Sequence, residues 1–159
     1  MNRRDVLGML GGAAVLAGQR APAASAAGLP PVTVHKTESC GCCKLWVEHL
    51  QKAGFAVKVV NSDNLAPVKQ RLGVPAAMGS CHTAEVGGYF VEGHVPVQDV
   101  RRLLAGKPRA RGLAVPGMPA GSPGMEVSSG EVAPYEVLLV GTDGSAQVYA
   151  RHGGKQGGK

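Results

Sequence analysis

Stretches that alternate apolar and polar residues are interleaved along this chain with stretches whose apolar residues recur at helical spacing. Residues 32–36 alternate in the way expected of a half-buried strand. In the segment that follows, the apolar positions fall on one face of a helix: Leu45, Trp46, Leu50 and Ala53. We therefore predict a strand and then a helix, joined by a turn at residues 39–44.

The same two patterns continue to residue 104. Further strands are expected around residues 55–60, 83–86 and 89–92, and further helices over residues 61–72 and 97–104. Gly87-Gly88 between the two short strands is typical of a tight hairpin, and Pro96 is well placed to open the last helix. The resulting βαβαββα order predicts an α/β (α+β) protein with a thioredoxin-like core.

The rest of the chain predicts a long loop and one more hairpin. Residues 107–134 are punctuated by prolines and glycines and are expected to be loop throughout. Residues 135–140 and 146–150 are apolar enough to pair as strands around the turn Thr142-Asp143-Gly144-Ser145. We therefore expect a C-terminal β-hairpin added to the core.

Three of the four cysteines lie within the turn between the first strand and the first helix, as Cys40-Gly41-Cys42-Cys43. Free backbone N–H groups at a helix N-terminus favour a thiolate over a thiol. The fourth cysteine, Cys81, lies in the loop that enters the third strand, and in a thioredoxin-like fold that loop faces the cysteine turn. We therefore expect all four sulfurs to converge.

Converging sulfurs allow two kinds of chemistry. Cys40 could form a reversible disulfide with Cys43 or with Cys42, with Cys81 resolving it, which would make the protein a thiol–disulfide or copper oxidoreductase. Alternatively, the four thiolates could bind a soft ion: Cu(I), zinc or a [2Fe–2S] centre. Zinc usually takes two separated ligand pairs, so a three-plus-one arrangement favours Cu(I). We favour metal binding, and whether the protein is also an enzyme stays open.

Other soft ligands lie near the cysteines in the sequence or in the loop that could fold over them. Thioether and imidazole beside thiolate is a ligand set typical of copper trafficking proteins. The candidates for these secondary ligands are Met78, His82, His94, Met118 and Met125.

The first residues predict a targeting segment. Arg3-Arg4, the uncharged apolar run of residues 6–18 and the small residues after it are typical of a signal peptide, and the paired arginines indicate the twin-arginine route. We expect a signal peptide over residues 1–26, a metal-binding domain over residues 27–151 and a disordered tail over residues 152–159. The apolar run is too short for an ordinary membrane span, so no stable membrane anchor is expected.

The charge of the chain argues against nucleic acid as a partner. The formal net charge is +6, but several of the cations lie in the leader or in the glycine-rich tail. Aromatic residues make up only 4% of the chain. A nucleic-acid interface needs clustered positive charge together with stacking or groove-reading elements, and the predicted domain has neither.

Four segments together resemble the CopG-type family of exported CxCC copper-resistance proteins. They are Cys40-Gly41-Cys42-Cys43, residues 80–84, residues 91–96 and residues 118–126, and they follow one another in the order of that family. The resemblance covers roughly residues 32–130 and implies a periplasmic, thioredoxin-like protein that binds copper through its cysteines. The expected partners are copper ions and another periplasmic copper protein. A ligand role for His94 or the methionines does not follow from the resemblance.

Overall fold

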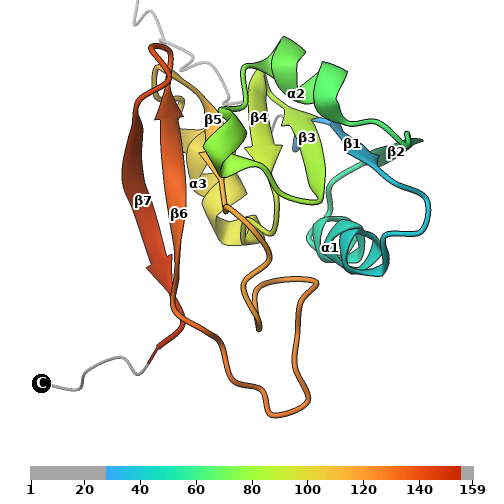
Figure 1. The fold of residues 1–159 in the computed structure, drawn as a ribbon. Helices are drawn as coiled ribbons and strands as arrows, with labels where there is room; N and C mark the ends of the chain where they lie inside the picture. Colours follow the sequence, from blue (N-terminus) through green and yellow to red (C-terminus); the bar gives the residue numbers. More distant parts are fainter. Residues whose placement is uncertain (1–27, 155–159) are drawn as a thin grey trace, which may run out of the picture.

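The structure of the protein is a computed structural model that describes residues 28–154, so the predicted signal peptide lies outside the described residues. Figure 1 shows one mixed α/β fold with a long loop beside α1. Its elements are β1 (Val32–Lys36), α1 (Gly41–Lys52), β2 (Val57–Asn61), α2 (Ala66–Leu72), the 3₁₀ turn η1 (Ala76–Met78), β3 (His82–Val86), β4 (Tyr89–Glu92), α3 (Val97–Gly106), β5 (Ala110–Ala114), β6 (Tyr135–Gly141) and β7 (Ala146–His152).

The predicted α/β class, the βαβαββα order and the added C-terminal hairpin are confirmed. The prediction of loop throughout residues 107–134 is wrong, because β5 forms at Ala110–Ala114. Arg111 and Gly112 break the apolar pattern that would identify a strand. The strand forms nonetheless because it is paired on both sides, with β4 in parallel and with β6 in antiparallel orientation.

All seven strands form one sheet in the order β2-β1-β3-β4-β5-β6-β7. β1 runs parallel to β2 and antiparallel to β3, with Lys36 paired to His82. The end of β1 and the start of β3 therefore lie at the same edge of the sheet. This register brings the turn after β1, which carries three cysteines, close to Cys81, which directly precedes β3.

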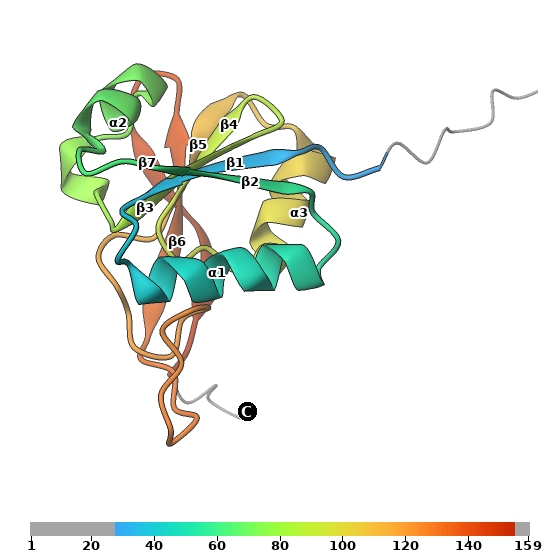
Figure 2. The same ribbon diagram turned by 90° about the vertical axis from the view of Figure 1, so that its right-hand side faces the viewer.

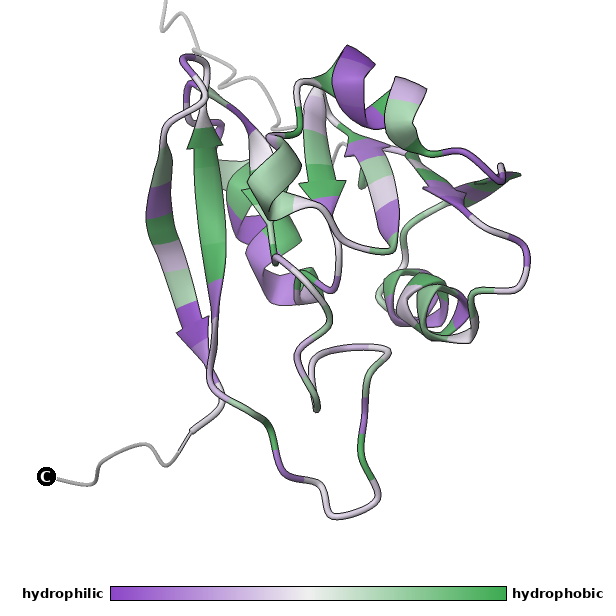
Figure 3. Ribbon diagram, in the orientation of Figure 1, coloured by the Kyte–Doolittle hydropathy of each residue, from purple (hydrophilic) through white to green (hydrophobic). Residues whose placement is uncertain are grey.

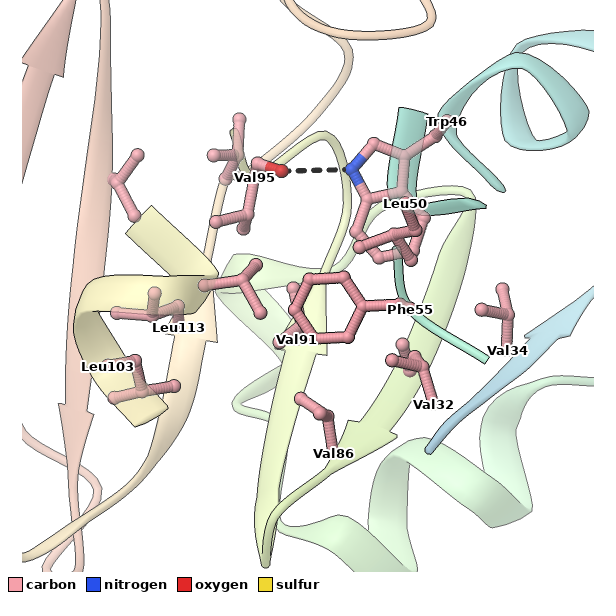
Figure 4. Close-up of a cluster of buried hydrophobic side chains, with 14 of the residues drawn as sticks. Val32, Val34, Trp46, Leu50, Phe55, Val86, Val91, Val95, Leu103 and Leu113 are labelled. Carbon is pink, nitrogen blue, oxygen red and sulfur yellow. Dashed lines mark hydrogen bonds between the residues drawn. The ribbon is translucent and has the colours of Figure 1, made fainter. Parts of the chain in front are cut away.

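The main hydrophobic core lies between the sheet and the helices α1 and α3. Trp46 and Leu50 of α1 pack there with Leu103 of α3 and with buried valines of the strands (Figure 4). Burial of the Trp46 indole requires a partner for its N–H group, and Nε1 donates to the backbone oxygen of Val95 at 2.9 Å. The predicted core role of Trp46 is confirmed, and the apolar positions follow the inner side of these elements in Figure 3.

A second, smaller cluster covers the opposite face of the sheet. Phe90, Ala114 and Val140 form its buried part, and Leu72 and Met78 pack against them. Figure 2 shows α1 and α2 on opposite sides of the sheet. Side chains of successive strand residues alternate between the two faces, so Phe90 and Val91 belong to different clusters.

The C-terminal hairpin is tied to α3. Strand β7 reaches His152, one residue beyond the predicted end of the domain, and His152 Nε2 lies 2.6 Å from Asp99 Oδ2 of α3. The predicted division of the chain stays a prediction, because residues 155–159 of the tail lie outside the described residues. Within residues 28–154, no helix has both the length and the apolar character needed to span a membrane.

Gly112 allows β4 and β5 to approach each other, and we expect Gly112→Ala to weaken their pairing. A Cβ at position 112 would lie 2.0 Å from the backbone oxygen of Phe90, so one of the strands would have to move. The expected loss is about 2–3 kcal/mol in the free energy of unfolding, measured by chemical denaturation. Gly106→Ala is the matched control, since its Cβ would meet only Pro108 Cδ at 4.0 Å. Equal stability of both variants would contradict this account of the strand pairing.

Candidate metal centre

The cysteine turn forms the N-terminus of α1. Cys40 is the N-cap residue, and its backbone oxygen accepts from the N–H of Lys44 at 3.3 Å. Cys42 and Cys43 lie in the first turn of the helix, with Cys43 fully buried and Cys42 partly exposed. The positive end of the helix dipole is therefore directed at these sulfurs, which favours their thiolate form once they are reduced.

Cys40 and Cys43 form a disulfide in this structure, whereas Cys42 and Cys81 are free. Of the two pairings that the sequence left open for Cys40, the structure contains the one with Cys43. The two linked residues lie at the ends of a C-x-x-C segment, where redox-active pairs commonly occur. The centre therefore holds two thiols and one disulfide in the state described.

Cys81 faces the cysteine turn, as predicted. The Sγ of Cys42 lies 3.4 Å from the Sγ of Cys40 and 3.8 Å from the Sγ of Cys81. The sulfur atoms of all four cysteines lie within 4.8 Å of one another. Four sulfurs this close can coordinate a shared soft cation once the disulfide is reduced.

The environment of Cys81 keeps its sulfur protonated when no metal is bound. Burial, followed by the proximity of Cys42, raises the pKa of the Cys81 thiol to about 11. A metal ion that bound here would replace that proton, because only the thiolate is a strong ligand. Metal binding at Cys81 would therefore release a proton at neutral pH.

His94 presents an unprotonated ring nitrogen to Cys81. Its Nδ1 lies 2.8 Å from the backbone oxygen of Pro123, which can only accept, so Nδ1 carries the proton. Its Nε2 lies 3.2 Å from Cys81 Sγ. Burial lowers the pKa of His94 below its usual value, which keeps the ring neutral. A backbone carbonyl that fixes one nitrogen while the other faces the metal is a common arrangement for histidine ligands.

His82 approaches the same sulfur from inside the core. Its Nδ1 lies 3.3 Å from Cys81 Sγ, and its ring lies 4.4 Å from that of Trp46. Burial and, secondarily, the nearby His94 lower the pKa of His82 to about 3, so this ring is also neutral. Cys81, His82 and His94 offer ligand atoms within 4.8 Å of one another.

The loop between β5 and β6 packs onto the cysteine turn, as the sequence analysis expected. A Cβ at Gly124 would lie 2.6 Å from the backbone oxygen of Cys42, so only glycine permits this approach, and its φ of +88° also favours glycine. Met118 and Met125 lie in this loop, with Met118 53% exposed and Met125 half-buried. The loop therefore covers part of the centre and holds His94 through Pro123.

The structure separates Met78 from the other candidate ligands. Met78 lies in η1 and packs against the apolar cluster around Phe90 on the other face of the sheet. This contact gives the side chain a packing role, which is what methionine most often has.

The sequence analysis missed Lys69 and Glu92 as residues that touch the Cys81 loop. Glu92 is fully buried, and its Oε1 accepts from the backbone N–H of Ser80 at 2.6 Å. Lys69 of α2 forms an ion pair with this carboxylate. The signal available in the sequence was a glutamate that ends an otherwise apolar strand, because a buried carboxylate requires partners.

Comparisons with known proteins agree with this site. The family described as "Protein of unknown function, DUF411" matches residues 78–125. A solved structure named "Copper resistance protein copG- Form 1" is 44% identical, with a TM-score of 0.75, and the match covers 79% of this chain and 99% of that one. For "Copper resistance protein copG- Form 2" the identity is 44%, the TM-score 0.74 and the coverage 78% and 98%. No curated protein matches the chain. At this identity and coverage, the chain belongs to the CopG family of copper resistance proteins.

Proposed function

We propose that this protein binds Cu(I) through Cys40, Cys42, Cys43 and Cys81 and acts in periplasmic copper resistance. The observation that carries the proposal is the convergence of four sulfur atoms within 4.8 Å of one another. The names of its structural relatives support copper as the metal. Copper is the cargo of the protein in this proposal, and other periplasmic copper proteins are its partners in transfer.

The donor set favours Cu(I) over harder ions. Thiolates are soft ligands, and the nearest nitrogen donors, on His82 and His94, belong to neutral imidazoles. Carboxylates and water, which suit Mg²⁺ and Ca²⁺, do not line this cluster of cysteines and histidines. Three sulfurs on one tight turn suit the low coordination numbers of Cu(I) better than the separated pairs of a structural zinc site.

Reduction of the Cys40–Cys43 disulfide controls how many thiolates are available. In the oxidised state Cys42 and Cys81 are the free thiols, and His94 is the nearest further donor to Cys81. Two electrons and two protons convert the disulfide into two thiols, which completes the set of four cysteine ligands. In an oxidising periplasm the protein would therefore need a reductant, or copper itself, to keep the full site open.

A second candidate function is that of a thiol–disulfide or copper oxidoreductase. The specific observation is a free thiol, Cys42, whose Sγ lies 3.4 Å from the Sγ of Cys40 in the disulfide. A thiolate at Cys42 could attack Cys40, forming a Cys40–Cys42 bond and releasing the sulfur of Cys43 as a thiolate. The same four sulfurs could thus exchange disulfide partners.

Cys81→Ser is expected to weaken Cu(I) binding by the reduced protein, because it removes the one sulfur contributed from outside the cysteine turn. We expect at least about a tenfold rise in Kd, or ~1.4 kcal/mol. The measurement is an anaerobic titration with Cu(I) against a competing chromophoric chelator. Met78→Leu is the matched control, since it removes a soft sulfur that packs in the other apolar cluster. Equal affinity of the wild type and Cys81→Ser would exclude the four-sulfur site.

His94→Ala is expected to weaken Cu(I) binding by about tenfold if Nε2 is a ligand or orients Cys81. His35→Ala is the control, because His35 pairs with Glu85 on β3 instead of with a cysteine. The same competition titration measures both variants. A His94→Ala protein that binds as tightly as the His35→Ala protein would restrict the site to sulfur.

The oxidoreductase candidate predicts a reduction potential in the range of catalytic disulfides, from about −270 to −120 mV. It also predicts turnover of a disulfide substrate that is lost in Cys40→Ser. Redox titration with glutathione buffers and thiol counting measures the potential. A disulfide that stays oxidised below about −300 mV and exchanges with no substrate would leave copper binding as the function.

A further inference from the structure

A buried ion pair lies beneath the loop that carries Cys81, and the proposed site does not use it. Glu92, at the end of β4, is fully buried, and Lys69 of α2 has a side chain that is 21% exposed. Taking a carboxylate out of water is costly unless every oxygen finds a partner. The partners of this carboxylate therefore show which parts of the chain it holds in place.

Both oxygens of Glu92 are occupied. Oε1 accepts from Lys69 Nζ and, at 2.6 Å, from the backbone N–H of Ser80. Oε2 accepts from the Thr83 hydroxyl at 2.6 Å. Lys69 Nζ donates in addition to Thr83 Oγ1 at 2.9 Å and to the backbone oxygen of Ser80 at 3.2 Å. The network is thus closed over three separate elements of the chain.

The residue that this network grips is Ser80, which directly precedes Cys81. Glu92 fixes the backbone N–H of Ser80, and Lys69 fixes its backbone oxygen. The side chain of Ser80 donates to the backbone oxygen of Gly117 at 2.6 Å, which adds the covering loop. Cys81 lies between η1 and the first residue of β3, outside regular structure, so its position depends on these neighbours.

Gly93 makes the close approach of Ser80 possible. A Cβ at position 93 would lie 2.6 Å from Ser80 Oγ and 2.6 Å from the backbone oxygen of Val115, and the φ of Gly93 is +71°. The chain therefore turns away directly after Glu92 and leaves room for the Cys81 loop above the carboxylate.

We propose that Glu92, paired with Lys69, is a positioning residue for Cys81, which it holds through the backbone of Ser80 at the distance from Cys42 that a shared metal ion requires. The inference rests on the proposed function for its purpose and on the geometry of Ser80 for its mechanism. A buried pair of this kind can often be replaced by apolar residues with little loss of stability. Its effect on Cys81 can therefore be separated from its effect on folding.

The test measures the spacing of Cys42 and Cys81 without copper. In a Cys40→Ser/Cys43→Ser background, the two remaining thiols are cross-linked with dibromobimane. Each sulfur displaces one bromide, and the doubly linked product is fluorescent. Glu92→Leu, which removes both acceptor oxygens, is expected to slow cross-linking at least tenfold. Glu92→Gln keeps one acceptor oxygen for Ser80 and is expected to restore most of the rate.

Glu85→Leu is the matched control. Glu85 also faces α2 and accepts from Arg71 at 2.7 and 3.0 Å, but it does not contact Ser80. This control should cross-link at the wild-type rate. A Glu92→Leu protein that is folded and cross-links as fast as Glu85→Leu overturns the proposal. If Glu92→Leu does not fold, the apolar pair Lys69→Met/Glu92→Leu takes its place: slow cross-linking supports the proposal and a wild-type rate overturns it.

Cu(I) competition titrations of the same substitutions, with all four cysteines present, separate this inference from the proposed function. We expect Glu92→Leu to raise the Kd for Cu(I) at least tenfold and Glu92→Gln and Glu85→Leu to leave it near the wild-type value. Failure of the wild type to bind Cu(I) would overturn the proposed function alone, because the cross-linking rates would still report on the position of Cys81. An unchanged Kd in Glu92→Leu would overturn the positioning role.

Discussion

The antiparallel register of β1 with β3 is the constraint on which the centre depends. Because Lys36 pairs with His82, the turn that follows β1 and the loop that precedes β3 meet at one edge of the sheet. A one-residue slip in this register would turn His82 and its neighbours to the opposite face. The convergence of Cys81 with the cysteine turn is thus set by strand pairing in the middle of the sheet, at a distance from any flexible terminus.

Around that meeting point, the surroundings favour neutral donors. Burial lowers the pKa of both His82 and His94 and raises that of Cys81, so all these groups are uncharged without a metal. A soft monovalent cation can then enter with little electrostatic opposition and exchange for a thiol proton. The disulfide between Cys40 and Cys43 adds a redox condition to this site, because it withdraws two of the four sulfurs from coordination.

Much of this arrangement could be predicted from the sequence, since it follows from local patterns. Alternation in residues 32–36, the hairpin glycines and Pro96 each act within a few residues, and the elements they indicate are confirmed. β5 was missed because pairing with two neighbours outweighs the poor strand propensity of Arg111 and Gly112. Local sequence carries no record of such tertiary pairing.

The site follows the same division. Proximity of Cys81 to the cysteine turn follows from the order of elements, whereas the choice of Cys43 as the partner of Cys40 depends on helix geometry that spacing alone left open. The grip of Lys69 and Glu92 on Ser80 joins residues from α2, β4 and an irregular loop, so no motif announces it.

Copper K-edge X-ray absorption of the reduced, Cu(I)-loaded protein tests the central claim most directly, because it counts the sulfur atoms bound to the metal. The account predicts a first shell dominated by sulfur in which the sulfur count falls when Cys81 is replaced by serine. A shell of nitrogen and oxygen, or a sulfur shell that the substitution leaves unchanged, would contradict it.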